Sequence, residues 1–318
     1  MSAAENNLTM TLRAISNLGN VSEDIVEIPP MAHPINRGLG GSSFLVRVPE
    51  GSVVYFVKKV SDVIRASHDF SCMVKMAQQS SSLSLTPTLL DSDEAQGLMV
   101  FEGLPDTWKY GTTKAFRDPD ISNKAAIALK AIHGTEALSK TFTPFDRIRL
   151  LVEELDAFAA QNGKRVYPEY FHTMLDWVSR TEMAIKAAGT DLTPCKGENN
   201  LSDFMIGQDG DLRLVDFDQA ANGDPYSDLG TLANEYCRTD EDVSKLVEDY
   251  EGSAIPSVVA RVKLYVVVSA FQLGLWGLVS HLRVPETEIE YQKYGQNQLL
   301  YCRSAISRWN IGRLLRDI

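Results

Sequence analysis

Several features are scarce in this sequence, and each absence argues against a class of protein. The 318 residues include four cysteines, Cys72, Cys195, Cys237 and Cys302, and no CxxC pair. This argues against a disulfide scaffold or a zinc ribbon, and we expect reduced thiols in the core of a cytoplasmic protein. Basic residues are outnumbered, 31 against 42 acidic, which gives a net charge of −11. This balance disfavours nucleic acid and anionic membranes and mildly favours a cationic substrate.

A long uninterrupted apolar run is also missing. The longest candidate, Leu264 to Leu282, is broken by Ser269, Gln272 and two glycines, which predicts a buried helix and no membrane span. The polar N-terminus MSAAENNLTM predicts no signal peptide. A composition of 44% hydrophobic and 23% charged residues is typical of a soluble globular protein with one or two domains.

One acidic stretch, Thr193 to Gly230, is the most informative part of the chain. Apolar residues 204–206 and 212–215 flank a turn at Gly207–Gly210, which predicts a β-hairpin. A tight hairpin brings its two ends together, and with them four carboxylates, Glu198, Asp203, Asp216 and Asp218. Such a cluster needs a cation to relieve its repulsion, and hard oxygen ligands suit Mg²⁺.

The first third of the chain is rich in β patterns. Residues 36–44 (NRGLGGSSF) predict a glycine-rich loop, followed by strands over 44–48 and 53–60, the second of which carries Lys58 and Lys59. Glycines let backbone N–H groups approach phosphates, and a strand lysine can pair with them. An ordinary turn with two solvated charges is the alternative interpretation.

The remaining pattern predicts a two-lobed α+β protein. After a helix at Asp69–Met76 come strands at Thr88–Asp91 and Gly97–Gly103. Amphipathic patterns then predict helices over 122–132, 147–160, 167–188, 227–236, 240–250, 257–283 and 286–315.

The acidic stretch resembles the choline/ethanolamine kinase and aminoglycoside phosphotransferase family. The matching residues are Val215-Asp216-Phe217-Asp218, Gly223-Asp224-Pro225 and Asp228-Leu229. The family's catalytic loop, His-Gly-Asp, four residues and Asn, is divergent here, with Lys196-Gly197-Glu198 and Asp203 in its place. The resemblance extends from about Gly38 to the C-terminus. It implies a protein-kinase-like fold, with a β-rich nucleotide-binding lobe over 1–102 and a helical lobe over 103–318 that holds the catalytic loop and acceptor site.

The resemblance also implies a role for individual residues. Gly40, Gly41 and Ser42 would face the phosphates, Lys58 (or Lys59) would bind them, and Glu102 would mark the hinge beside adenine. Asp69 would pair with the lysine, and Asp228 would brace the catalytic loop. Asp216 and Asp203 would bind Mg²⁺, with ATP or GTP as the second cofactor, and Glu198 would be the base. Lys196 could pair with Glu198 or a phosphate, and His133 is expected to be structural.

The acceptor site is expected among the C-terminal helices. Residues 271–277 (FQLGLWG) resemble an aromatic stretch of choline kinases, with Leu273 in place of the first Trp. Trp276 and Tyr294 are the candidate acceptor residues, because aromatic faces attract ammonium groups. Packing of both rings in the core is the alternative. An amino alcohol, an amino sugar or another small hydroxyl compound remains open as the acceptor, as does the oligomeric state.

The divergent loop leaves two functions open. The first is a Mg²⁺-dependent phosphotransferase, or kinase, that acts on the hydroxyl of a small cationic molecule. Glu198 keeps the family's carboxylate but is one methylene longer, and a misplacement of roughly 1 Å can cost about 10²-fold in rate. Asp203 keeps an oxygen ligand and adds charge, which should tighten Mg²⁺ binding. The alternative is a pseudokinase that binds a nucleotide or a partner without turnover.

Overall fold

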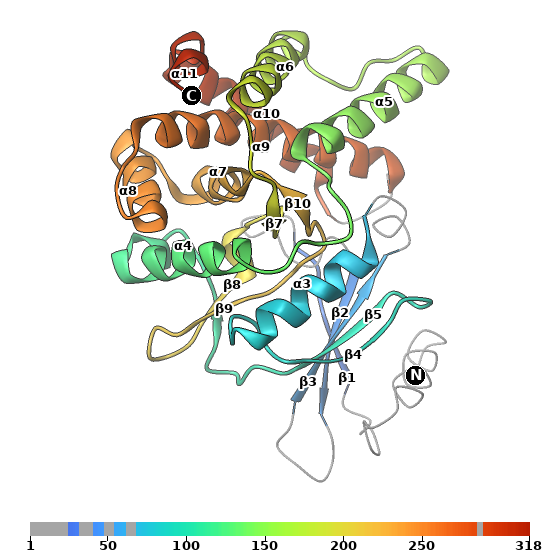
Figure 1. The fold of residues 1–318 in the computed structure, drawn as a ribbon. Helices are drawn as coiled ribbons and strands as arrows, with labels where there is room; N and C mark the ends of the chain where they lie inside the picture. Colours follow the sequence, from blue (N-terminus) through green and yellow to red (C-terminus); the bar gives the residue numbers. More distant parts are fainter. Residues whose placement is uncertain (1–24, 32–40, 48–53, 62–67, 285–288) are drawn as a thin grey trace.

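A five-stranded antiparallel sheet forms the N-terminal part of the molecule (Figure 1). The structure is a computed structural model that describes residues 25–31, 41–47, 54–61, 68–284 and 289–318. The strands are β1 (Ile25–Ile28), β2 (Gly41–Arg47), β3 (Val54–Val60), β4 (Leu89–Asp93) and β5 (Leu98–Glu102). Their order in the sheet is β1-β2-β3-β5-β4, so β3 is central and paired on both sides. The central position fixes Lys58 between two neighbouring strands.

Helix α3 (Phe70–Ser82) covers one face of this sheet (Figure 1). Its buried residues Phe70, Met73 and Met76 belong to the same apolar cluster as Val60 of β3 and Met99 of β5. Asp69 begins the helix as its N-cap and accepts a hydrogen bond from the backbone N–H of Cys72. An N-cap of this kind satisfies one of the free N–H groups of the first turn.

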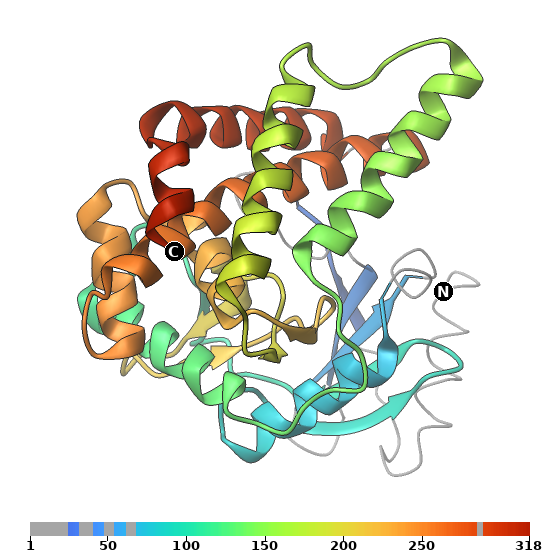
Figure 2. The same cartoon turned by 45° about the horizontal axis from the view of Figure 1, so that its top comes forward.

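The rest of the chain is mainly helical. Its helices are α4 (Pro119–His133), α5 (Pro144–Asn162), α6 (Phe171–Ala188), α7 (Pro225–Tyr236), α8 (Asp240–Glu251), α9 (Pro256–Arg283), α10 (Tyr291–Arg308) and α11 (Ile311–Asp317), with 3₁₀ turns η1 (Ala115–Arg117) and η2 (Leu201–Asp203). Helices α5 and α6 project away from the sheet, joined by a long loop (Figure 2).

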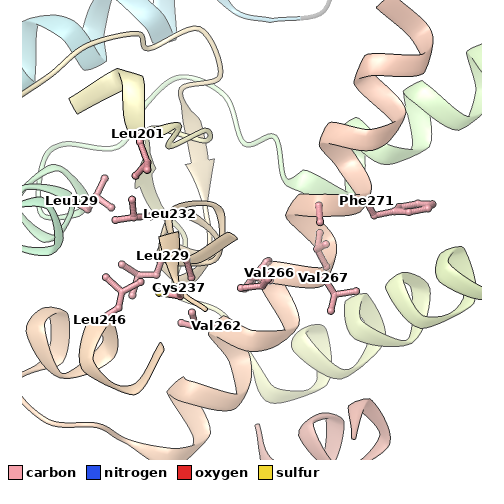
Figure 3. Close-up of a cluster of buried hydrophobic side chains, with 14 of the residues drawn as sticks. Leu129, Leu201, Leu229, Leu232, Cys237, Leu246, Val262, Val266, Val267 and Phe271 are labelled. Atoms are coloured by element: carbon pink, nitrogen blue, oxygen red, sulfur yellow. The ribbon is translucent and has the colours of Figure 1, made fainter. Parts of the chain in front are cut away.

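Helix α9 is the centre of the helical part and packs against α5, α7, α10 and α11. Val262, Val266, Val267 and Phe271 extend from it into the apolar core, which Figure 3 shows together with leucines of α7 and α8. This helix is long and apolar enough to cross a membrane, but 94% of its most apolar window is buried inside the protein. This burial identifies α9 as a core helix, as the sequence predicted.

Two small sheets position the acidic stretch. Strands β8 (Phe204–Ile206) and β9 (Leu212–Leu214) form the predicted hairpin, and β6 (Lys109–Tyr110) pairs with β8. Strand β7 (Thr193–Cys195) pairs with β10 (Ala221–Gly223). The backbone N–H of Leu214 also donates to the carbonyl of Leu85, 2.7 Å away, beyond the end of α3. These pairings hold residues 196–203 and 215–220 beside each other and against the N-terminal part.

Within the described residues, the predicted elements agree with the structure to within a few residues at their ends, except in two places. The single helix expected over 286–315 is two helices, because Trp309 is extended and Asn310 caps α11 by accepting a hydrogen bond from the N–H of Arg313. Within the expected glycine-rich loop, residues 36–40 lie outside the described residues, and residues 41–44 are part of β2. The division into lobes at 102/103 remains our interpretation. All four cysteines are free and buried, as predicted.

Candidate active site

A cavity of about 280 Å³ lies between the five-stranded sheet and the acidic stretch. One part of its wall is apolar and includes Leu45, Phe56, Met99, Phe101 and Trp108. The other part is charged and is formed by Lys58, Asp203, Asp216 and Asp218. An apolar wall suits a planar base and a charged wall suits phosphates and cations, so the residues present fit a nucleotide.

Lys58 is the central charge of this cavity. Its Nζ lies 2.7 Å from Oδ1 of Asp216 and 2.7 Å from Oδ1 of Asp218. Burial by itself would lower the pKa of Lys58, but the two carboxylates outweigh burial and raise this pKa above its usual value. Lys59, the alternative lysine, is exposed, because successive side chains of a strand point to opposite faces.

The structure corrects the prediction that Asp69, on the helix after β3, pairs with Lys58. Asp69 caps α3 through Cys72 and also accepts a hydrogen bond from the hydroxyl of Ser71, 2.6 Å away. The ion pairs of Lys58 go instead to Asp216 and Asp218. A side chain bound to the first turn of its own helix is held away from the lysine, so Asp69 has a structural role in this structure.

Asp216 stands in a backbone conformation that non-glycine residues seldom adopt, with φ of 66°. Strain of this kind is often found at functional sites. Burial would raise the pKa of the Asp216 carboxyl, but Lys58 and Lys196 lower it below its ordinary value. Burial and the neighbouring Asp216 raise the pKa of Asp218. With a side chain 37% exposed on the cavity wall, the Asp216 carboxylate fits a hard divalent cation such as Mg²⁺.

Asp228 on α7 holds the backbone of the segment 196–203, which is expected to be the catalytic loop. This carboxylate is fully buried and accepts hydrogen bonds from the backbone N–H groups of Lys196, at 2.7 Å, and Gly197, at 2.8 Å. His133 contacts the same carboxylate through Nε2, at 3.1 Å, and Tyr250 through Nδ1. Gly197 has φ of 88°, and a Cβ there would lie 2.2 Å from the carbonyl oxygen of Gln219. The loop is therefore fixed by its backbone and requires this glycine.

Lys196 forms a contact that the sequence did not predict. Its side chain is 1% exposed, and its ammonium donates to Oδ2 of Asp203, 2.8 Å away, and to the backbone carbonyl of Glu198. The predicted contact with Glu198 thus involves that residue's backbone. Burial raises the pKa of the Asp203 carboxyl, and the Lys196 ammonium acts in the opposite sense. Asp203, which was predicted to bind metal, therefore already forms an ion pair with Lys196.

Glu198 is held by two side-chain amides. Asn200 donates to its Oε1 at 2.8 Å, and Gln219 donates to its Oε2. Burial and the charge of Asp216 raise the pKa of Glu198 above its ordinary value, although the bond from Asn200 opposes them. A carboxylate with a raised pKa and a fixed orientation is suited to accept a proton near neutral pH.

Sequence reasoning missed Gln219 and the residues that support it. The backbone carbonyl of Gln219 accepts a hydrogen bond of 2.6 Å from buried Arg147, and its Oε1 accepts one of 3.2 Å from Gln272 of α9. Gln219 therefore connects Glu198 to α9. The sequence did contain one signal for this contact. Gln272 is a polar residue within the apolar pattern of α9, and a buried amide needs a hydrogen-bond partner.

Glu235 on α7 is a second missed carboxyl group. Burial and the nearby charge of Glu198 raise its pKa to about 7, while a hydrogen bond from the backbone of Leu201 partly opposes the shift. The carboxyl lies close enough to the catalytic loop to interact with Glu198. Its position one residue before Tyr236, near the end of an apparently ordinary helix, gave no distinguishing signal in the sequence.

The raised pKa of Glu235 predicts a specific pH dependence of stability. The folded carboxyl binds its proton more tightly than the ordinary value of 4.5, so its favourable contribution is complete below that value and is lost as pH rises through about 7. Glu235→Gln removes this titration. Relative to the variant, the parent should lose free energy of unfolding between pH 5 and 8, measured by denaturant unfolding. Parallel pH curves for the two proteins would contradict the assignment.

The candidate acceptor residues lie together on α9 and α10. The rings of Trp276 and Tyr294 meet edge to face, with centroids 5.8 Å apart, and Tyr291 contacts the same indole at 5.7 Å. Tyr294 and Leu273 form a small apolar cluster separate from the main core. Trp276 is partly exposed and lies one helical turn from Gln272, which places it near the network that leads to Glu198.

Of the remaining residues predicted to bind the nucleotide, some line the cavity and others do not. Gly41 and Ser43 line the cavity, whereas Ser42 lies between them in β2, where side chains alternate in direction. A Cβ at Gly41 would lie 2.1 Å from the carbonyl oxygen of Lys59, so this close approach requires glycine. Gly40 lies outside the described residues. Glu102 lines the cavity, and its own backbone N–H is bound to Thr88.

Comparison with a family profile decides the classification. The profile of the phosphotransferase enzyme family matches residues 32–263, more than half of the chain. The chain belongs to this family. A comparison with curated proteins gave no match.

Solved structures place this phosphotransferase-family chain in the two-lobed kinase-like fold. It is similar to a choline/ethanolamine kinase family protein from Mesorhizobium loti, with a TM-score of 0.79, 18% identity and 98% of each chain covered. A choline kinase from Streptococcus pneumoniae gives 0.77, with 17% identity and 96% and 100% coverage. A spectinomycin phosphotransferase in complex with ADP and spectinomycin gives 0.61, with 12% identity and 95% and 98% coverage. Identities this low establish the fold alone.

Proposed function

We propose that this chain transfers the γ-phosphoryl group of ATP or GTP to the hydroxyl of a small cationic acceptor, an amino alcohol or an amino sugar. The observation that carries the proposal is that Asp216 lies 2.7 Å from Lys58 and close enough to Glu198 to raise its pKa, so that three separate segments meet at one site. Family membership supports the reaction class, and a similar structure is described as a complex with ADP and spectinomycin.

Each residue has a defined part in this reaction. Lys58 would exchange one of its carboxylate partners for a phosphate oxygen, because its ammonium already faces the cavity. Asp216 would hold Mg²⁺, which neutralises charge on the transferred group when bound. Glu198, oriented by Asn200 and Gln219, would accept the proton of the acceptor hydroxyl.

The acceptor's charge is inferred from the surroundings of Glu198. Glu235 ionises near neutral pH and stands within electrostatic reach of Glu198. Trp276 offers a partly exposed aromatic face from α9. A carboxylate and an aromatic ring are two groups that attract an ammonium ion, and both lie on helices that support the catalytic loop.

Binding without turnover is a second candidate, and one observation favours it. Lys58 bridges Asp216 and Asp218, and Lys196 is bound to Asp203, so lysines already neutralise the acidic cluster. A pseudokinase could retain this arrangement without binding a metal. Under this alternative the cavity would hold a nucleotide or contact a partner while Glu198 had no proton to accept.

A direct assay separates the two functions. The protein is incubated with Mg·ATP or Mg·GTP and a panel of hydroxylated amines, amino sugars and uncharged alcohols, and products are read by mass spectrometry. The proposal predicts that one class of amine gains a single phosphoryl group. A panel without any phosphorylated product, for a protein that binds nucleotide, would support the binding-only function.

Nucleotide binding is expected to stabilise the protein in a Mg²⁺-dependent manner. A ligand at about 100 times its dissociation constant should add about 2.7 kcal/mol to the free energy of unfolding. Thermal-shift titration measures this effect. The Asp216→Ala variant should lose the part of the shift that depends on Mg²⁺, and Asp209→Ala, in the distant turn of the β8–β9 hairpin, is the matched control. An equal shift in the Asp216→Ala variant and the parent would count against metal binding at Asp216.

Trp276→Ala is expected to weaken the binding of the acceptor and to leave the affinity for the nucleotide nearly unchanged. Loss of one aromatic face should cost about 0.5–2 kcal/mol of acceptor binding. Isothermal calorimetry with each ligand measures both affinities, and Trp177→Ala, an aromatic of α6, controls for loss of a partly buried indole. Equal weakening of both ligands would show that Trp276 supports the fold and does not contact the acceptor.

A further inference from the structure

Lys196 lies inside the catalytic loop with its charged end enclosed by protein. Its side chain is 1% exposed, and its ammonium is bound to the Asp203 carboxylate and to the carbonyl of Glu198. Its backbone N–H is fixed separately by Asp228. A lysine held at both ends in this way has no room to leave its partner when a ligand enters.

Asp203 also depends on this contact. The carboxylate is buried and lines the charged wall of the cavity. A buried charge is costly unless a paired charge and hydrogen bonds compensate it. Either a divalent cation or an ammonium can provide the opposite charge, and in this chain the ammonium of Lys196 is built into the loop.

Asp216 differs from Asp203 in its exposure to solvent and in how its lysine partner is held. It is much more exposed, and its partner Lys58 is shared with Asp218, at 2.7 Å from each carboxylate. Lys58 can therefore keep one ion pair while it releases the Asp216 carboxylate. The two acidic groups on the cavity wall are unequal, because Asp216 can accept a cation and Asp203 is already occupied.

We propose that the Lys196 ammonium takes the place of a divalent cation on the Asp203 side of the cavity, so that this chain binds a single divalent cation, at Asp216. The inference rests on the proposed function, in that nucleotide and cation share this cavity. It also explains why Lys196 and Asp203 occur together in this loop, in place of the His and Asn of the family's motif. Each charge would be unfavourable in this buried position without the other, and together they leave one metal position open.

Counting bound Mn²⁺ tests the proposal without requiring turnover. Mn²⁺ is titrated into the protein mixed with an equimolar amount of β,γ-imido-ATP, at concentrations well above the dissociation constant of the complex so that little analogue is free to bind Mn²⁺, and free Mn²⁺ is measured by electron paramagnetic resonance. The parent should bind one ion per chain. Lys196→Met frees Asp203 and should bind a second ion, whereas the matched double variant Lys196→Met/Asp203→Asn should return to one.

Each alternative result has a distinct meaning. Two ions in the parent, or one ion in both the parent and Lys196→Met, would overturn the proposal while leaving the phosphotransferase function intact. No bound Mn²⁺ in a parent that binds the analogue would overturn the proposal together with the metal-dependent function.

Asp203→Asn provides a second test if Lys196→Met fails to fold. Because Asp203 is not a metal ligand in this proposal, Mn²⁺ affinity should change by less than about threefold, the size of an indirect charge effect. A loss of tenfold or more, about 1.4 kcal/mol, would show that Asp203 binds the ion and would overturn the proposal.

Discussion

Glu198→Gln is expected to lower turnover by roughly 10²–10⁴, the usual contribution of a general base. Glutamine keeps the size of the side chain, and its amide oxygen can still accept a hydrogen bond from one of the two amides, Asn200 or Gln219, that donate to Glu198. It cannot accept a proton, so the loss should appear in kcat. Nucleotide affinity should change little, because Lys58 and Asp216 line the cavity and Glu198 is not among its lining residues. Steady-state kinetics and calorimetry on the same preparation measure the two quantities.

Two further variants make this result specific. Glu154→Gln removes a carboxylate that pairs with Arg283 on the surface of the helical part, and it should retain full turnover. Glu198→Asp shortens a carboxylate that Asn200 and Gln219 hold in place, so we expect lower activity than in the parent. A parent and a Glu198→Gln variant with equal kcat would exclude Glu198 as the base.

Lys196→Met is expected to lower the free energy of unfolding by about 3–5 kcal/mol, because removal of one partner leaves a buried charge without compensation. The remaining carboxylate of Asp203 would lie in a site with little access to water. The double variant Lys196→Met/Asp203→Asn removes both charges and should recover most of the loss. Urea denaturation of the metal-free proteins measures all three free energies.

A surface lysine provides the matched control for this change. Lys186 forms an ion pair of 2.7 Å with Glu182, but its side chain is 71% exposed. Lys186→Met should therefore alter stability by no more than about 0.5 kcal/mol. A similar small effect for Lys196→Met would show that the buried pair with Asp203 contributes little to the fold.

The sequence predicted those parts of the site that depend on local pattern. The β8–β9 hairpin follows from two apolar segments around a glycine turn, and its closure brings Glu198, Asp203 and Asp216 together. The resemblance favoured Lys58 over Lys59 as the phosphate lysine, and in the structure Lys58 lines the cavity while Lys59 is exposed, because strand periodicity places neighbouring side chains on opposite faces. The helical part was also predictable, apart from the break at Trp309 and Asn310.

The partners of the charged groups could not be predicted in the same way. The sequence suggested that the acidic cluster needs a cation, but it did not show that Lys58 and Lys196 provide positive charge from within the protein. Pairing depends on side-chain direction across segments far apart in sequence, as in the contact between Gln219 and Gln272. Asp69 was assigned to Lys58 by analogy, whereas capping of α3 is a local interaction that competed with this role.

The central claim is that the site formed by Lys58, Glu198 and Asp216 transfers a phosphoryl group. The most direct test is a single-turnover reaction, with the protein in excess over γ-labelled ATP and in the presence of Mg²⁺ and the acceptor that binds best. We expect the label to appear on the acceptor with the parent protein, and much more slowly with Glu198→Gln at equal nucleotide occupancy. Label that remains entirely in ATP, or that appears as inorganic phosphate without a phosphorylated acceptor, would contradict the claim.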